Sequence, residues 1–388
     1  MRIALLLLLA LSGCNCGPRA SDVTRSLVAT TTADEGWAVN YPKQRKLLWM
    51  VDRLWVFYAD GTNLVVKTTT DGVEFSEPKI VLEQGVFGHR CSFTFDGTYV
   101  HSACCLANLG EDVFYRRGRP ASDGTIAWDA EQLAFDVAPT ENVLYPKVLV
   151  DAAGFPWIGF LLFTGGQTQA PPNRAMISRS SRSDGVWETA SGFPAALSDD
   201  GKDTFPDPLG VALANGDTYW AWVPDGDARL TGQRWNASGA VGPREDLSGG
   251  KFRSGHFNLL AVGDDVHLIY GSGILAYRMR RADGSLTREV TAGAGNGHTS
   301  LTSLGGDRVA ITWLDTFTQR VMERDVRPDQ DPPQALELLD AKEETLSGRL
   351  AINLNTIERA SGPFRSVVAV TLGREEPYDV VLLTRPQE

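Results

Sequence analysis

The chain has 388 residues, of which 43% are hydrophobic and 22% are charged, as in globular proteins with one large domain or two ordinary ones. Its formal net charge is −11 and it has no basic tail or lysine/arginine run, which argues against binding to nucleic acid. The 39 glycines and 20 prolines suit a chain with many turns, and its 35 aromatic residues suit β-strands.

The first residues predict export. Arg2 precedes an apolar stretch over residues 3–10, which is too short to span a bilayer as a permanent helix, and Leu11-Ser12-Gly13-Cys14 follows. This tetrapeptide resembles the lipobox of bacterial lipoproteins, in which the cysteine is lipidated and becomes the first residue of the mature chain. The resemblance implies a signal peptide over residues 1–13, a lipidated tether over 14–22 and a single domain over 23–388.

Asn15 follows the cysteine where an Asp tends to retain such lipoproteins at the inner membrane. The resemblance therefore implies an anchor at the bacterial outer membrane or cell surface. No other apolar stretch approaches membrane length, so we expect contact with the membrane through the lipid anchor alone.

The remaining sequence repeats a short apolar run, a turn and an aromatic-rich run with period-two alternation, which reads as strands joined by hairpins. The first run of each unit begins near Lys46, Cys91, Lys147, Leu209, Phe257, Thr299 and Leu350. The intervals are about 45, 56, 62, 48, 42 and 51 residues, and a repeat of that length predicts an all-β fold, a β-propeller.

Seven units can be counted, each expected to form a four-stranded blade, but the last has only three strands before the chain ends. The segment over residues 23–30 has no partner of its own and could supply the missing strand. That pairing of the two termini would close the ring. Six blades with a terminal extension is the alternative.

Four cysteines remain once Cys14 is assigned to lipid: Cys16, Cys91, Cys104 and Cys105. If Asp96-Gly97 is a two-residue hairpin turn, Cys91 and Cys104 are diagonal neighbours on one face, where a disulfide could join them. Buried free thiols are the alternative. No Cys/His spacing resembles a zinc site, so we expect neither a metal nor another cofactor.

A recurrent turn falls between the third and fourth strands of several units. It centres on Asp71 in Thr68–Phe75 (TTTDGVEF), and on Asp123, Asp184 and Asp283 later. The pattern resembles the Asp-box of sialidase-like (BNR-repeat) propellers, where such turns lie on the rim opposite the active site. We therefore expect these aspartates to hold the turn by hydrogen bonds to its own amides.

The residues at the start of each innermost strand form a second repeat. Tyr-Pro occurs at Tyr41 and Tyr145, Phe-Pro precedes Asp207, and Gly-His occurs at His89, His256 and His298. In a propeller these positions converge on the channel mouth. The candidate ligand-binding residues are Tyr41, Lys43, His89, Arg90, Tyr145, Lys147, Asp207, Arg253, His256 and His298.

Histidine can exchange protons near neutral pH, and the cations Lys43, Arg90, Lys147 and Arg253 would favour an anionic ligand. The alternative for each histidine is a structural bond to a backbone carbonyl in a tight turn. The remaining histidines, His101 and His267, lie within second strands and are expected to be structural.

The resemblance implies a surface-anchored, sialidase-like propeller that recognises carbohydrate, such as an acidic glycan, at the channel mouth. The sialidase Arg-Ile-Pro motif is missing from the sequence. A glycan-cleaving enzyme, either a sialidase-like glycosidase or a polysaccharide lyase, is one alternative, because histidine, tyrosine and a cation suffice for lyase chemistry. A protein-interaction platform is another.

Overall fold

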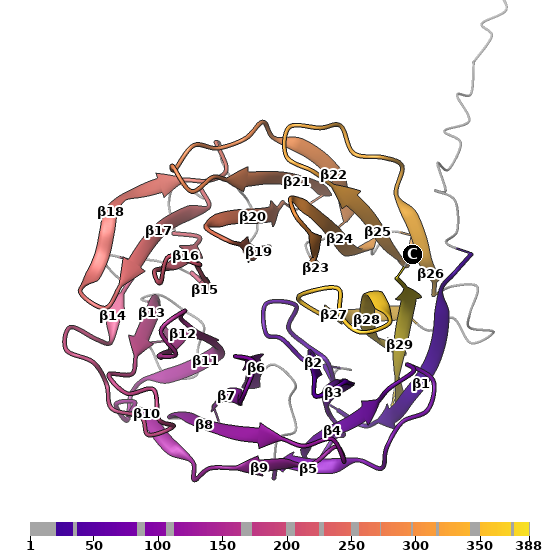
Figure 1. Cartoon of the computed structure of the whole chain (residues 1–388), viewed down its shortest axis with the longest axis horizontal. Coiled ribbons are helices and arrows are strands. Elements are labelled where there is room, and N and C mark those ends of the chain that lie inside the picture. Colours follow the sequence, from indigo (N-terminus) through magenta and orange to yellow (C-terminus); the bar gives the residue numbers. More distant parts are fainter. Residues whose placement is uncertain are drawn as a thin grey trace, which may run out of the picture.

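The computed structural model is an all-β propeller whose seven blades surround a central axis (Figure 1). The structure describes residues 21–33, 37–83, 90–105, 112–163, 173–198, 206–224, 229–249, 256–271, 273–295, 298–315, 318–341, 350–373 and 376–387. The predicted fold class and the count of seven are confirmed, and the six-bladed alternative is wrong. Cys14, Cys16, His89 and Arg253 lie outside the described residues. Within them, no helix is long and apolar enough to cross a membrane.

Each blade is an antiparallel sheet, and in blades 1 to 6 the innermost strand comes first in the chain. Blade 1 contains β2 (Leu47–Met50), β3 (Arg53–Ala59), β4 (Leu64–Thr69) and β5 (Lys79–Leu82). Blade 2 contains β6 (Cys91–Phe95), β7 (Val100–Cys105), β8 (Val113–Pro120), β9 (Ile126–Trp128) and β10 (Gln132–Phe135). Two short strands, β9 and β10, occupy the outermost position of this blade, because both pair with β8.

The next four blades repeat this order. Blade 3 contains β11 (Asn142–Val150), β12 (Pro156–Phe163), β13 (Asn173–Arg179) and β14 (Ala195–Ala196). Blade 4 contains β15 (Leu209–Ala212), β16 (Thr218–Trp222), β17 (Thr231–Asn236) and β18 (Gly239–Asp246). Blade 5 contains β19 (Phe257–Val262), β20 (Asp265–Tyr270), β21 (Gly273–Arg280) and β22 (Val290–Gly295). Blade 6 contains β23 (Thr299–Gly305), β24 (Arg308–Asp315), β25 (Arg320–Val326) and β26 (Leu336–Asp340).

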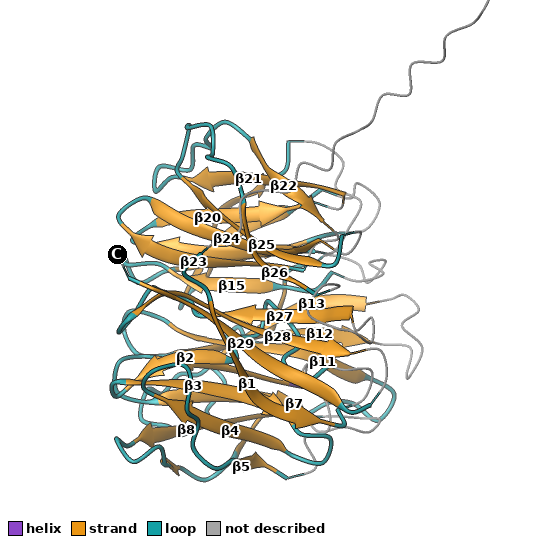
Figure 2. Ribbon diagram, turned by 90° about the vertical axis from the view of Figure 1, so that its right-hand side faces the viewer, coloured by secondary structure: helices purple, strands orange, loops and turns teal. Residues whose placement is uncertain are grey.

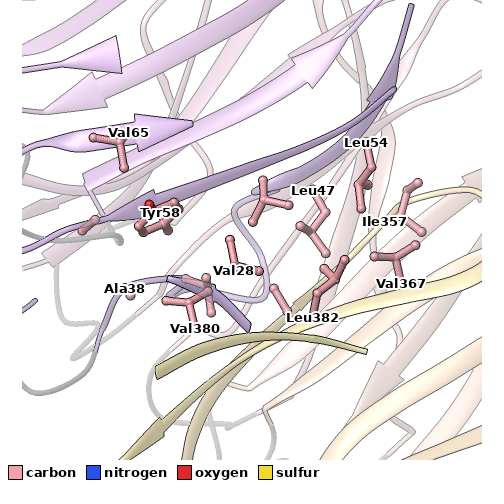
Figure 3. Close-up of a cluster of buried hydrophobic side chains, with 14 of the residues drawn as sticks. Val28, Ala38, Leu47, Leu54, Tyr58, Val65, Ile357, Val367, Val380 and Leu382 are labelled. Carbon is pink, nitrogen blue, oxygen red and sulfur yellow. The ribbon is translucent and has the colours of Figure 1, made fainter. Parts of the chain in front are cut away.

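The seventh blade contains strands from both ends of the chain, as predicted. Its order is β1 (Thr24–Thr31), β29 (Tyr378–Pro386), β28 (Phe364–Gly373) and β27 (Leu350–Thr356). β1 pairs antiparallel with β29, with Thr24 opposite Thr384 and Thr31 opposite Tyr378. Val28 of β1 packs with Val380 and Leu382 of β29 and with apolar side chains of blade 1 (Figure 3).

Apolar side chains fill the spaces between neighbouring blades. All eight residues of β12 are buried, because both faces of an inner strand are covered by the blades on either side. Trp220 of blade 4 shows how close that contact is: a Cβ atom added to Gly159 of blade 3 would lie 2.3 Å from its ring. This is the packing expected from the aromatic-rich runs.

Cys91 and Cys104 are joined by a disulfide, with their Cα atoms 4.2 Å apart. They lie directly opposite each other, so the prediction of a diagonal pair was wrong. The turn is centred one residue later than Asp96-Gly97, because Asp96 pairs with Tyr99: its backbone nitrogen donates to the Tyr99 carbonyl at 3.1 Å. The neighbouring Cys105 is buried and outside the disulfide, and its thiol donates to the Arg90 carbonyl at 3.7 Å.

Two faces of the ring can be defined from strand direction. The innermost strands begin at one face, here called the N face, and end at the other, the C face, where the C-terminus also lies (Figure 2, left). The turns that join first to second strands and third to fourth strands therefore lie at the C face.

The four Asp-Gly turns lie between third and fourth strands, as predicted, and so belong to the C face. In the first of them, Asp71 Oδ1 accepts hydrogen bonds from the backbone nitrogens of Val73 at 2.8 Å and Glu74 at 3.0 Å. Gly72 has φ +77°, which a residue with a side chain rarely adopts. The local contacts match the turn-holding role expected for this aspartate.

Candidate functional site

A short segment from the first unit fills the axis of the ring at the N face. Residues 40–46, here called the plug, lie between β1 and β2 and reach the centre of the ring, where Figure 1 shows the indigo loop beside β2. The plug contacts all six other blades. With blade 2, for example, the Phe93 nitrogen donates to the Arg45 carbonyl at 3.2 Å. The channel is therefore closed by the chain itself at this end.

Buried amide side chains fix the plug to the surrounding strands. Nδ2 of Asn355 in β27 donates to the carbonyls of Tyr41 at 3.0 Å and Gln44 at 2.7 Å, while its Oδ1 accepts from the Lys46 nitrogen at 3.0 Å. Nδ2 of Asn258 in β19 donates to the Pro42 carbonyl at 3.2 Å. Gln44 in turn donates to the carbonyl of Pro146 in blade 3 at 2.8 Å. Because an unpaired buried backbone group is costly, these amides fix the path of the plug.

Lys43, Lys147 and Asp207 form a buried ion cluster next to the axis. Nζ of Lys43 lies 3.0 Å from Oδ2 of Asp207, and Nζ of Lys147 contacts Oδ1 of the same carboxylate. The three residues are only 5%, 3% and 1% exposed. Burial lowers the pKa of both amines, and for Lys147 the nearby Lys43 lowers it further.

This cluster changes the expected electrostatics of the channel mouth. Lys43 and Lys147 were predicted to present two positive charges to an anionic ligand. The single carboxylate between them leaves at most one surplus positive charge, and neither lysine is exposed. Their influence on a ligand at the N face is therefore a local potential and not direct contact.

Four aromatic rings meet over the plug, two from tyrosines and two from histidines. The ring of Tyr41 lies with its centroid 5.2 Å from that of Tyr145, 6.3 Å from that of His256 and 6.4 Å from that of His298. The two imidazoles are 5.4 Å apart. These residues, here called the aromatic cluster, come from the starts of blades 1, 3, 5 and 6, as the aligned tripeptides predicted.

Tyr145 lies in a β-bulge, which places its side chain in the aromatic cluster. The register between β11 and β12 shifts between Leu144 and Lys147, and Tyr145 has φ +55°, a left-handed conformation that is rare for a bulky residue. Its ring packs with the apolar side chains of Leu161 and Phe163. Such strained positions concentrate at functional sites.

The cluster is held in its uncharged forms near neutral pH. Burial, followed by the neighbouring His298 and Lys43, lowers the pKa of His256 to about 4. Burial also lowers the pKa of His298 and raises that of Tyr41. Among the described residues no hydrogen-bond partner reaches the buried Nδ1 atom of His298. The cluster therefore combines neutral hydrogen-bonding groups with apolar ring faces.

Arg90 lies half-buried at the start of β6, and its positive charge acts to lower the pKa of Tyr145 against the effect of burial. It is thus near the aromatic cluster. His89 and Arg253, predicted for the same mouth, lie outside the described residues.

His101 and His267 lie away from the channel mouth, within second strands. Nδ1 of His101 is 2.7 Å from the Tyr115 hydroxyl and its Nε2 is 2.9 Å from Oδ2 of Asp96. Nδ1 of His267 is likewise 2.7 Å from the Tyr277 hydroxyl. Both imidazoles thus have structural partners.

The sequence interpretation missed the residues that hold the plug, above all Gln44, Asn258 and Asn355. A signal was present, since both asparagines interrupt apolar runs that predict buried innermost strands. In the described part of the chain, no group of three or more His, Cys, Asp or Glu side chains is arranged to hold a metal ion.

Comparisons with known proteins support the fold. No protein-family model and no curated protein sequence matches the chain. Among solved structures, the polysaccharide lyase Uly1 is similar over 91% of this chain and 92% of its own, with 9% identity and a TM-score of 0.54. The WD40 domain of coronin from Toxoplasma gondii is similar over 96% and 89%, with 10% identity and a TM-score of 0.53.

A Hadza microbial sialidase, Hz136, is also similar, over 84% of this chain and 74% of its own, with 12% identity and a TM-score of 0.47. At identities this low, the similarity to the polysaccharide lyase and to the coronin domain shows a shared β-propeller architecture alone. Function must therefore be argued from the residues of this chain.

Proposed function

We propose that the protein is anchored through Cys14 at the bacterial outer membrane or cell surface and binds carbohydrate, an acidic glycan, at the aromatic cluster. The observation that carries this proposal is the convergence of Tyr41, Tyr145, His256 and His298 from four separate blades. A tyrosine offers a flat apolar face and a hydroxyl, and a neutral imidazole offers one donor and one acceptor. Sugars present the matching combination of apolar ring faces and hydroxyl groups.

The local charge favours an acidic sugar over a neutral one. The ion cluster below the rings contains two amines and one carboxylate, and the Arg90 guanidinium lies within electrostatic reach of Tyr145. Together they give the channel mouth a positive potential in a protein whose net charge is −11. Such a potential would attract the carboxylate of a uronate or a sialate.

A glycan array followed by calorimetry tests this proposal. We expect binding to acidic glycans that weakens by about tenfold or more in His298→Ala and Tyr145→Phe, which remove hydrogen-bonding groups from the cluster. Tyr99→Phe, on the C face, is the matched control and should bind normally. Unchanged binding in both cluster variants would reject the aromatic cluster as the site. Capture of one surface protein without any glycan binding would instead support the protein-interaction alternative.

A polysaccharide lyase is the second candidate, favoured by the contact of Tyr41 with two neutral imidazoles. A neutral histidine can remove the proton α to a uronate carboxylate, while a tyrosine hydroxyl protonates the leaving glycosidic oxygen as the C–O bond breaks and a C=C bond forms. Arg90 would stabilise the developing negative charge on the carboxylate.

The lyase candidate has its own readout. Its unsaturated uronate product absorbs ultraviolet light, and that absorbance should appear with a uronate polymer and disappear in His256→Ala or His298→Ala. If the protein binds the same polymer but no such absorbance appears, it recognises the polymer without cleaving it, and the lyase candidate is rejected.

The anchor is tested separately from the site. In a bacterial host, Cys14→Ser should abolish incorporation of labelled fatty acid and release the protein from the membrane fraction. A membrane-bound Cys14→Ser protein would contradict the lipid anchor without bearing on the glycan site.

A further inference from the structure

A second concavity lies on the other side of the plug from the aromatic cluster. It is a cavity of about 770 Å³ between the innermost strands, within the range of small-molecule sites. The plug residues Lys43 and Arg45 line its inner end. The exposed turn residues Thr98, Ala152 and Ala214 line its outer end, so the cavity opens at the C face. This is the face that the Asp-Gly turns predicted to be non-functional.

Arg45 presents a guanidinium group to this cavity. Its Nη1 atom donates to Ser300 Oγ at 3.3 Å and to the Leu301 carbonyl at 3.5 Å, which are long contacts with neutral acceptors. Among the described residues no carboxylate lies within ion-pair distance of it. Glu358, near the C face, acts at longer range and only partly offsets the effect of burial, which lowers the pKa of Arg45. The remaining N–H donors of this planar group could therefore bind a carboxylate in a bidentate manner.

Charged residues line both ends of the cavity, and apolar side chains line much of the wall between them. Lys43 and Lys147 lie at the inner end beside Arg45, while three acids and one cation lie towards the C face: Asp96, Asp151, Glu358 and Arg359. A carboxylate would thus be favoured at the inner end, and hydroxyl donors would be favoured near the outer acids. A hydroxylated carboxylate of one or two sugar rings has this distribution of groups.

We propose that the cavity is a second ligand site, which takes a small sugar acid with its carboxylate on Arg45 and its hydroxyls towards the C face. The site is separate from the aromatic cluster, because the plug lies between them. A long polymer could reach the N face, whereas only a small molecule fits inside the cavity. The proposal therefore does not depend on the glycan site at the N face.

Calorimetry tests this cavity site with two ligands. D-glucuronate carries the carboxylate, and D-glucose is the matched sugar without it. We expect glucuronate to bind and glucose to bind at least about tenfold more weakly. Arg45→Gln should weaken glucuronate binding by a similar factor. Arg45→Lys should restore only part of the lost affinity, because lysine lacks the planar pair of N–H donors of a guanidinium group. Arg288→Gln, which alters an exposed surface arginine, is the control and should bind normally.

Ala152→Trp provides an independent variant, since it narrows the outer end without touching Arg45. It should also reduce glucuronate binding, and thermal unfolding of each variant shows whether the fold is retained. No glucuronate binding, equal binding of glucose, or full binding by both Arg45→Gln and Ala152→Trp would overturn the proposal. Loss of glucuronate binding in His298→Ala alone would place the ligand at the aromatic cluster, and would also overturn the cavity site.

Discussion

Nζ of Lys43 lies 3.0 Å from Oδ2 of Asp207, although 164 residues separate them in the sequence. The first residue belongs to the plug and the second precedes the innermost strand of blade 4. Their contact, shared with Lys147, ties the segment that closes the channel to the opposite part of the ring. The ion cluster is therefore expected to be structural as well as electrostatic.

Replacing Asp207 by Asn should destabilise the protein strongly. The change leaves two buried amines without their carboxylate, and breaking a buried ion pair in this way costs about 3–5 kcal/mol. Chemical denaturation measures the loss in the free energy of unfolding. The matched control is Asp331→Asn, whose exposed pair with Arg288 should contribute less than about 1 kcal/mol. An equally small effect of both substitutions would contradict the structural role of the cluster.

Much of the fold could be predicted from the sequence, because the seven-unit repeat and its period-two alternation are local signals. The closure by residues 23–30 was also predictable, since a three-stranded last unit needs a partner. The alignment of Tyr41, Tyr145, His256 and His298 in the repeat predicted that they meet at one channel mouth. It did so because a ring converts equivalent positions in a repeat into spatial neighbours.

The plug was not predictable from the same signals. It belongs to no strand, and its contacts with Asn258, Asn355 and Asp207 join residues far apart in the chain. The sequence overstated the positive charge at the mouth for that reason, because sequence spacing did not reveal that Asp207 pairs with both lysines. The register of Cys91 and Cys104 depended on a one-residue choice of turn, which the hydrogen bond between Asp96 and Tyr99 settles.

Stability should fall as the pH drops from about 6.5 to about 4. His256 and His267 have pKa values of about 4 in the folded protein, in both cases chiefly because of burial. In the unfolded chain they take up protons near pH 6.5, so in this window the unfolded state binds more protons and acid favours it. Above the window both histidines are neutral in both states and contribute no pH dependence.

A histidine variant separates this effect from the titration of carboxylates. His267→Gln removes one titrating group, and the free energy of unfolding should then depend less steeply on pH over the same window. The missing contribution should be on the order of 3 kcal/mol, from the shift of this deeply buried imidazole. Identical pH profiles for the two proteins would refute the assignment to His267.

Asp71→Ala should cost about 1 kcal/mol of stability and leave ligand binding unchanged, because Asp71 accepts hydrogen bonds within its own turn on the C face. Asp71→Asn keeps an oxygen acceptor and should lose less. Thermal unfolding and a glycan-binding measurement on the same samples check both statements. A binding defect without a stability change would mean that this turn takes part in ligand recognition.

Closure of the ring by β1 gives the last prediction. β1 pairs along its length with β29, and Val28, only 2% exposed, packs in the core shared by blades 7 and 1 (Figure 3). Deleting residues 1–31 would expose the edge of β29 and open that core, so we expect loss of cooperative unfolding or aggregation. Deleting residues 1–20 leaves β1 and the pair between Asp22 and Arg385 intact, and that protein should unfold as the longer chain does. Circular dichroism during heating and size-exclusion chromatography compare the two. A monomeric, cooperatively folded protein without β1 would show that the other three strands of blade 7 close the ring unaided.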